Sequence, residues 1–187
     1  MVAVTKTHAP EDIAPLIAAG QRDFGESRVQ EAAAKWPALR DAYPDLRLHM
    51  IGRLQSNKAV EAVALFDTIH SLDRPSLLDS LVEAGTRTGS LPDCFVQVNV
   101  GAEEQKGGVA LAQLGDFLKQ VRDSPLPLAG LMCIPPAGLE PAPFFALLSE
   151  LARRHDVTGL SMGMSADYET AVMLGATHVR VGSALFA

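Results

Sequence analysis

The chain has 187 residues, of which 48% are hydrophobic and 20% charged, and its formal net charge is −6. This length suits one domain with a sizeable core, and the acidic balance argues against a nucleic-acid or anionic-membrane partner, because such binders need a basic face. No apolar run approaches the roughly 20 residues that cross a bilayer, and the N-terminus lacks the pattern of a signal peptide.

Short β-branched runs alternate with longer helical patterns along the chain. The predicted strands are, in chain order, residues 2–5, 23–25, 46–51, 67–70, 94–100, 128–133, 159–162 and 178–181. Such alternation indicates a parallel sheet with helical crossovers. Eight strand–helix units favour closure, so we expect a single (β/α)8 TIM barrel over residues 1–187. An open flavodoxin-like sheet is the structural alternative.

Capping and helix-breaking residues mark the predicted helices. Ser27 and Gln30 have the spacing of a capping box, in which each side chain bonds a backbone N–H group of the first turn. Gly20 and Gly175 follow alanine- or leucine-rich stretches and are placed to end helices in a left-handed conformation. Pro15 suggests that the first helix begins near residue 13.

Residues with binding chemistry fall at the carboxyl ends of the predicted strands. Lys6 ends the first strand, Ser165 starts the helix after the seventh, and Arg180, Gly182 and Ser183 end the eighth. Barrels of this kind place active groups at this mouth and bind phosphate after strands 7 and 8. We therefore expect one lysine and one phosphate-like pocket at the same mouth.

Each candidate has a physical role and an ordinary structural alternative. Ser165 is expected to cap a helix whose N–H groups attract an anion, although most serine caps are only structural. Gly182 lacks a side chain, so the backbone of Gly182 and Ser183 can approach phosphate oxygens, or can simply pack tightly. Lys6 follows apolar residues, where lost solvation would favour the neutral amine that reacts with an aldehyde; most lysines are solvated charges. A buried Arg180 needs partners.

The remaining candidates form no recognisable centre. Cys94 and Cys133 are isolated in apolar surroundings, which predicts reduced core thiols and a cytoplasmic protein. No metal site is expected, because no paired spacing and no companion ligands accompany the histidines, which are His8, His49, His70, His155 and His178.

Six segments carry a further signature: VAVTKT at 2–7, FGES at 24–27, HMIGRLQSNK at 49–58, GLM at 130–132, LSMGMS at 160–165 and VRVGSALF at 179–186. Together, and in this order, they closely resemble the pyridoxal phosphate homeostasis protein family, which is similar to the barrel half of alanine racemase. Members usually carry a helix before the first strand, which this sequence lacks, and an asparagine where Ser27 stands.

The resemblance implies a role for each candidate residue. Lys6 would hold pyridoxal 5′-phosphate as a Schiff base. Ser165, Gly182 and Ser183 would hold the phosphate, and Arg180 would face the pyridine nitrogen. The implied function is that of a carrier or regulator of the vitamin B6 pool without established catalysis. We expect a monomer whose partners are the cofactor and, beyond it, amino acids or apo-enzymes that depend on the same cofactor.

A non-catalytic role also agrees with the residues. Racemisation needs a base on each face of the α-carbon, and alanine racemase takes one of them, a tyrosine, from a second domain that residues 1–187 do not supply. The only tyrosines, Tyr43 and Tyr168, give no reason to be placed over the cofactor. Arg180 would discourage protonation of the pyridine nitrogen and weaken the electron sink. The alternatives are an amino-acid racemase or lyase and a class I aldolase that uses Lys6 on a sugar phosphate.

Overall fold

The strands form a closed, all-parallel barrel. The computed structural model describes residues 1–103 and 105–186, so the last residue of the predicted domain, Ala187, lies outside the described part. The strands are β1 (Val2–Val4), β2 (Asp23–Glu26), β3 (Arg47–Met50), β4 (Thr68–Leu72), β5 (Asp93–Gln97), β6 (Leu128–Met132), β7 (Gly159–Met164) and β8 (His178–Val181). β8 pairs with β1 through Val2 opposite Arg180, which closes the barrel. The predicted (β/α)8 architecture is confirmed, and an open sheet is excluded.

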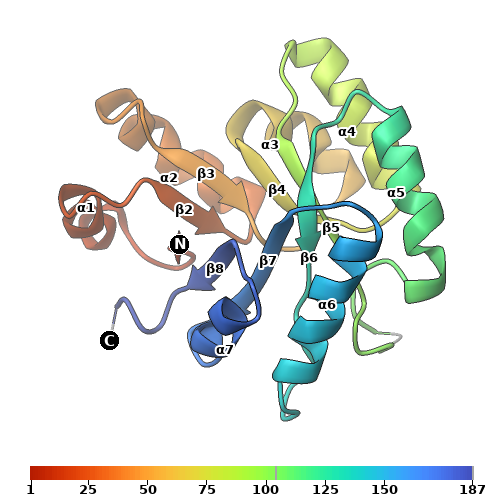
Figure 1. Ribbon diagram of the computed structural model, residues 1–187. Coiled ribbons are helices and arrows are strands. Elements are labelled where there is room, and N and C mark those ends of the chain that lie inside the picture. The colour runs from red at the N-terminus through yellow and green to blue at the C-terminus, as the bar shows by residue number, and fades with distance from the viewer. Residues whose placement is uncertain (104, 187) are drawn as a thin grey trace.

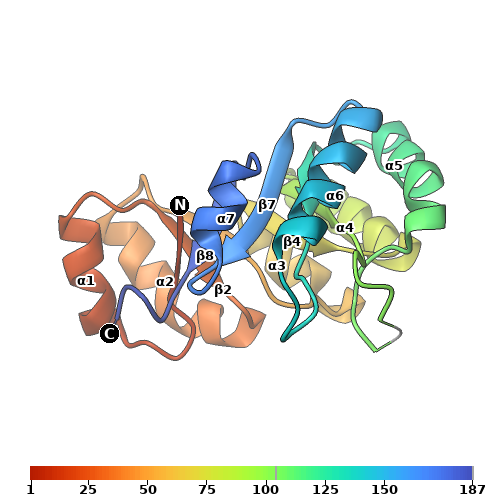
Figure 2. The ribbon, with the colours of Figure 1, turned by 60° about the horizontal axis from the view of Figure 1, so that its bottom comes forward.

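Helices connect successive strands and surround the barrel (Figure 1). They are α1 (Pro10–Ala18), α2 (Val29–Ala42), α3 (Ala59–Leu65), α4 (Pro75–Thr88), α5 (Leu114–Asp123), α6 (Ala142–Arg154) and α7 (Tyr168–Met173), with 3-10 turns η1 (Ser56–Lys58) and η2 (Leu111–Gln113) before α3 and α5. The C-terminal segment returns from β8 towards α1 (Figures 1 and 2). Its Phe186 ring stacks on His8, with centroids 3.7 Å apart, next to the turn that follows β1.

Side chains along each strand alternate between the helix layer and the barrel interior. On β2, Phe24 packs against Trp36 of α2 with ring centroids 5.1 Å apart, and both are fully buried. Asp23, one residue earlier, reaches His49 of β3 instead. The hydrophobic core therefore lies mainly between strands and helices, while polar side chains enter the interior of the barrel.

Two helix starts differ from the sequence-based prediction. α1 begins at Pro10 rather than near residue 13 and contains Pro15, because proline suits the first helical position and the Asp12 carboxylate accepts the Ala9 N–H at 3.1 Å. The predicted Ser27 cap of α2 is wrong. Arg28 holds the N-cap position without a side-chain capping bond. The predicted helix ends at Gly20 and Gly175 are confirmed, with φ of 95° and 97° just after α1 and α7.

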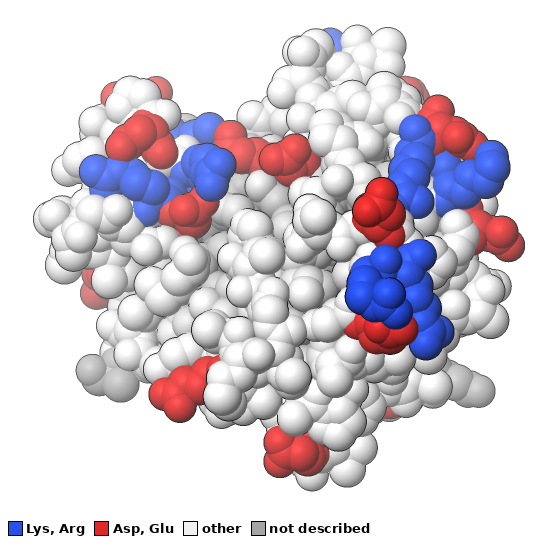
Figure 3. All heavy atoms as spheres, viewed as in Figure 1, with Lys and Arg blue, Asp and Glu red and all other residues white. Residues whose placement is uncertain are grey.

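Charge is mixed on the visible surface. In Figure 3, acidic and basic side chains are interspersed towards the edges, and the middle of that face carries neither. This face therefore presents no continuous basic patch, in keeping with the net charge of −6. Within the described ranges, no helix is both long and apolar enough to span a bilayer.

Candidate functional site

Lys6 lies in an exposed turn just beyond β1, at the C-terminal mouth of the barrel. The Thr5 N–H donates to the Gly25 carbonyl at 3.0 Å, which continues the β1–β2 pairing up to the residue before Lys6. The expected loss of solvation around Lys6 is wrong, because β1 ends at Val4 and leaves Lys6 clear of the apolar residues before it. The lysine is therefore presented to solvent by a fixed backbone.

Ser165 lies beside the end of β8, but it does not cap a helix as predicted. β7 continues to Met164 through Gly163, whose φ of 91° favours glycine, and α7 begins only at Tyr168 and has 6 residues. The Ser165 Oγ accepts a hydrogen bond from the Gly182 N–H at 3.1 Å instead. This bond joins the turn after β7 to the turn after β8, and we call the pair the Ser165–Gly182 cradle.

Gly182 packs too closely on β1 to carry a side chain easily. A Cβ at this position would lie 3.2 Å from the Val4 Cβ. The Gly182 carbonyl accepts the Leu185 N–H at 2.8 Å, so exposed Ser183 lies in a tight turn. Since Lys6 follows Val4 by two residues, the lysine and the cradle occupy the same mouth on adjacent strands. The gathering of these residues agrees with the sequence-based expectation.

Arg180 points into the barrel interior and is 4% exposed. Its Nη1 donates to the Ser161 Oγ at 2.6 Å and its Nη2 to the Cys133 carbonyl at 3.0 Å. Burial lowers the pKa of the guanidinium to about 10, although the charge of Asp167 acts in the opposite direction. Arg180 is therefore still a cation at neutral pH, and the described residues supply no carboxylate in contact with it.

A buried ion pair that the sequence analysis missed lies behind Lys6. Lys35 of α2, whose side chain is 8% exposed, is 2.6 Å from the Oε1 of fully buried Glu26 at the end of β2. The Lys35 amine also donates to the carbonyls of Thr5 at 2.8 Å and His8 at 3.1 Å, which flank Lys6 in the chain. The available signal was a glutamate, Glu26, directly after the apolar pair Phe24 and Gly25 at the end of β2. Lys35 ties the turn of Lys6 to α2.

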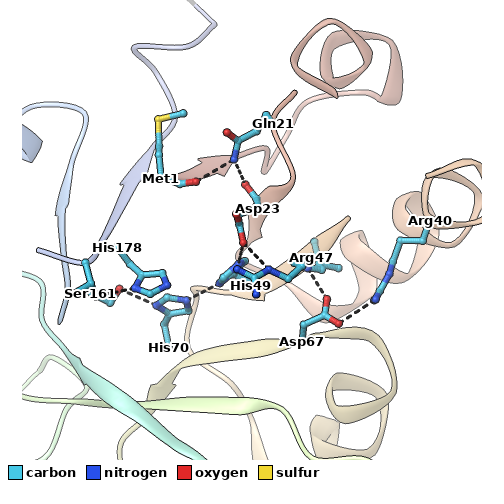
Figure 4. A network of polar contacts seen from close by, with 12 residues as sticks. Met1, Gln21, Asp23, Arg40, Arg47, His49, Asp67, His70, Ser161 and His178 are labelled. Atoms are coloured by element: carbon cyan, nitrogen blue, oxygen red, sulfur yellow. Dashed lines mark hydrogen bonds and ion pairs between the residues drawn. The ribbon is translucent and has the colours of Figure 1, made fainter. Parts of the chain in front are cut away.

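A row of polar side chains crosses the barrel interior and begins at Ser161, which accepts a hydrogen bond from Arg180. Figure 4 shows the row from Ser161 onwards. The Ser161 Oγ lies 2.7 Å from His70 Nδ1, His70 Nε2 lies 2.9 Å from His49 Nδ1, and His49 Nε2 lies 3.1 Å from Asp23 Oδ1. Asp23 begins β2, so the row ends at the opposite, N-terminal mouth. No group of three potential ligands in the described part of the chain is arranged to hold a metal ion.

A separate depression of about 600 Å³ opens between the loops after β2, β3 and β4. Four cationic side chains line it: Arg28, Arg53, Lys58 and Arg74. Two of these cations are neutralised locally, Lys58 by Glu61 at 2.8 Å and Arg74 by Asp73 at 2.5 Å. Because the depression lies after β2, β3 and β4 and the Ser165–Gly182 cradle lies after β7 and β8, the two occupy different sectors of the same mouth.

The chain is similar over its full length to known proteins. Residues 1–187 match the family described as alanine racemase, N-terminal domain. A pyridoxal phosphate homeostasis protein from Aquifex aeolicus is 40% identical, with 100% of this chain and 85% of the relative covered. A protein of the same name from Escherichia coli K12 is 36% identical, with 100% of this chain and 84% of the relative covered.

Solved structures with the same fold include two of PipY from Synechococcus elongatus. The form without PLP has a TM-score of 0.92 at 42% identity, and the form with PLP bound has 0.90 at 41% identity. Both comparisons cover 100% of this chain and 91% and 92% of PipY. An alanine racemase from Clostridium difficile shares the fold, with a TM-score of 0.76 at 14% identity, over 98% of this chain and 51% of the racemase.

Proposed function

Because this chain belongs to the pyridoxal phosphate homeostasis protein family, within the alanine racemase N-terminal domain family, we propose that it binds pyridoxal 5′-phosphate (PLP) as a Schiff base on Lys6 and acts in vitamin B6 homeostasis as a carrier or regulator. The observation that carries the proposal is the Ser165–Gly182 cradle at the mouth that also presents Lys6. The PLP-bound form of PipY, at 41% identity, supports the choice of ligand.

The residues of this mouth match the functional groups of PLP. The hydroxyls of Ser165 and Ser183 and the backbone around Gly182 suit a phosphate, which accepts hydrogen bonds strongly. Lys6 supplies a primary amine, and its Nζ would hold the aldehyde carbon through a C=N bond, with the carbonyl oxygen released as water. The N–H groups of Arg180 that do not bond Ser161 or Cys133 suit the lone pair of a pyridine nitrogen.

The same residues hold PLP without activating it. Bound PLP supplies an aldehyde that captures amines and a ring that withdraws electrons when its nitrogen is protonated. Arg180 only donates, so it leaves that nitrogen unprotonated. Tyr168 begins α7 at this mouth, but its hydroxyl donates to Glu169 Oε1 at 3.4 Å, and Tyr43 is exposed just beyond the end of α2. Neither tyrosine is held as a second base, which favours a carrier over a racemase.

The cradle can be tested with the double variant Ser165→Ala, Ser183→Ala. We expect it to weaken PLP binding much more than binding of pyridoxal, which has no phosphate, because each lost bond to a charged acceptor costs roughly 1.5–3 kcal/mol. Titration of the protein with each ligand, followed by the visible absorption of the Schiff base, measures both affinities. Ser80→Ala is the control, since Ser80 bonds the Ser76 carbonyl within α4. Equal losses for PLP and pyridoxal would show that the phosphate lies elsewhere.

The carrier assignment predicts negligible turnover of amino acids. With PLP loaded, the protein should exchange the α-proton of alanine for deuterium far more slowly than a racemase, because Arg180 gives a weak electron sink. NMR in deuterated water follows the exchange directly. Arg180→Glu is the informative variant, because a carboxylate favours protonation of the pyridine nitrogen. This variant should exchange the α-proton faster than the unaltered protein, although still slowly, and should bind PLP more weakly. Rapid exchange by the unaltered protein would instead support the racemase or lyase alternative.

A cytoplasmic location and a monomeric state complete the proposal. Cys94 and Cys133 are free and buried, and burial raises the pKa of both thiols, which keeps them protonated and unreactive. The recipients of the cofactor would be PLP-dependent apo-enzymes or amino acids. A sedimentation mass clearly above the 19.9 kDa of one chain would contradict the monomer.

A further inference from the structure

Polar side chains fill part of the barrel interior, where TIM barrels usually carry valine, isoleucine and leucine. One row runs through it, formed by Asp23, His49, His70, Ser161 and Arg180, which come from β2, β3, β4, β7 and β8. Figure 4 shows the first four joined side chain to side chain. Buried polar groups are costly unless every member is bonded, so an unbroken row of this kind points to a role beyond packing.

The two ends of the row set the direction of its hydrogen bonds. Arg180 has only donors, so the Ser161 Oγ accepts from it. Asp23 is ionised, because the hydrogen bond from His49 and the charge of Arg47, 3.0 Å away, lower its pKa to about 2 against the opposing effect of burial. An ionised carboxylate only accepts, so His49 donates through Nε2.

The middle of the row follows from these ends. In the tautomer that donates from Nε2, His49 accepts at Nδ1, so the bond from His70 is donated by Nε2. His70 then accepts at Nδ1, and the Ser161 hydroxyl donates to it. Burial and the charges of Arg180, His49 and His178 hold the pKa of His70 well below its usual range, which agrees with a neutral ring. Every bond therefore runs from Arg180 towards Asp23.

The surroundings of the two imidazoles disfavour a positive charge on either ring. The Phe95 ring stacks on His70 with centroids 4.6 Å apart, and His178 lies 6.0 Å from His70 and 6.2 Å from His49. His70 is fully buried and His49 is 2% exposed. A second charge in this space, beside the guanidinium of Arg180, is disfavoured by desolvation and by repulsion.

We infer that Ser161 and His70 are positioning residues that aim the Arg180 guanidinium at the cofactor ring, and that the row transmits the negative charge of Asp23 to Arg180 across the barrel. Arg180 has no carboxylate in contact among the described residues, and aligned hydrogen bonds that end on Asp23 compensate for that. The inference rests on the proposed function for the identity of the ligand. A carboxylate at one mouth thereby influences PLP at the other.

The direction of the bonds can be tested without PLP. Long-range ¹H–¹⁵N NMR of the cofactor-free protein at neutral pH distinguishes the protonation states of imidazole. We expect His49 and His70 both to be neutral with the proton on Nε2. A proton on Nδ1 of either ring, or a charged ring, would overturn the row as drawn. This result does not depend on where PLP binds or whether it binds.

The link to the cofactor is tested by removing the Ser161 hydroxyl, which bonds both Arg180 and His70. Ser161→Ala should raise the dissociation constant of PLP roughly tenfold or more, the equivalent of one bond to a charged group. PLP should shift the ¹⁵N signals of His49 in the unaltered protein but not in this variant. Ser71→Ala is the matched control, because Ser71 on β4 is also buried but its Oγ has no partner among the described residues.

Equal behaviour of Ser161→Ala and Ser71→Ala would overturn the inference. Asp23→Asn gives a second route if Ser161→Ala does not fold, since it keeps an acceptor for His49 and removes only the charge. It should weaken PLP binding severalfold, whereas Asp45→Asn, which removes an exposed carboxylate that pairs with Arg22 outside the row, should not. Absence of a borohydride-reducible adduct on Lys6 of the unaltered protein would refute the proposed function, while the imidazole result would stand separately.

Discussion

Replacement of Lys6 by alanine should abolish covalent attachment of PLP and leave the barrel folded. Lys6 is exposed beyond the end of β1, so loss of its side chain opens no cavity and stability should change little. Borohydride reduction followed by intact-mass measurement should show one added cofactor on the unaltered protein and none on Lys6→Ala. The yellow absorption of the adduct should be lost with it, and unfolding curves should nearly coincide.

Two other lysines of the same mouth provide matched controls. Lys58 is 2.8 Å from Glu61 and Lys106 is 2.6 Å from Glu103, so both amines are engaged in ion pairs. Lys58→Ala and Lys106→Ala should each keep the reducible adduct. Peptide mapping of the adduct to Lys58 or Lys106 in the unaltered protein would refute the assignment to Lys6. A colourless protein that forms a Schiff base with a sugar phosphate would favour the aldolase alternative.

Replacement of Lys35 by methionine should cost about 3–5 kcal/mol of unfolding free energy, the usual penalty for breaking one partner out of a buried ion pair. Glu26 is fully buried, and its Oε1 would keep only the Thr5 hydroxyl at 2.8 Å and the Trp36 indole N–H at 3.0 Å. Its Oε2 already has no hydrogen-bond partner among the described residues. Denaturant unfolding monitored by circular dichroism measures the loss.

The double variant Glu26→Gln, Lys35→Met separates charge from position. It buries no charge, so it should recover most of the lost stability. It cannot restore the bonds from Lys35 to the carbonyls of Thr5 and His8, so the turn of Lys6 should stay loose and PLP attachment slow. If the unfolding free energy of Lys35→Met lay within about 1 kcal/mol of that of the unaltered protein, the range of a surface ion pair, this role of Lys35 would be contradicted.

The barrel itself was predictable because its signal is local. Each strand is a short β-branched run, each helix a longer periodic one, and eight repeats of that unit favour closure. The limits of the strands were less predictable. β5 ends at Gln97, earlier than the predicted residue 100, and β7 runs on to Met164, because a strand ends where its neighbour stops pairing with it.

The gathering of Lys6, Ser165 and Gly182 at one mouth was also predictable, since carboxyl ends of parallel strands meet at one edge. The role of Ser165 was not. The sequence predicted a helix cap, but β7 continues through the left-handed Gly163 to Met164 and α7 begins only at Tyr168, so Ser165 bonds Gly182 instead. A residue's place along the chain was enough to locate it, whereas its hydrogen-bond partner depended on the neighbouring strand.

By itself, the sequence determined the fold class and the placement of Lys6, Ser165 and Gly182 at one mouth of the barrel. Only the tertiary structure decided that Lys35 neutralises Glu26 behind that lysine, and that a polar row reaches Arg180 from Asp23. His49 and His70 are 21 residues apart, and His70 and Ser161 are 91 apart. No local pattern encodes such contacts, because they form only when the barrel closes and brings its strands to a common axis.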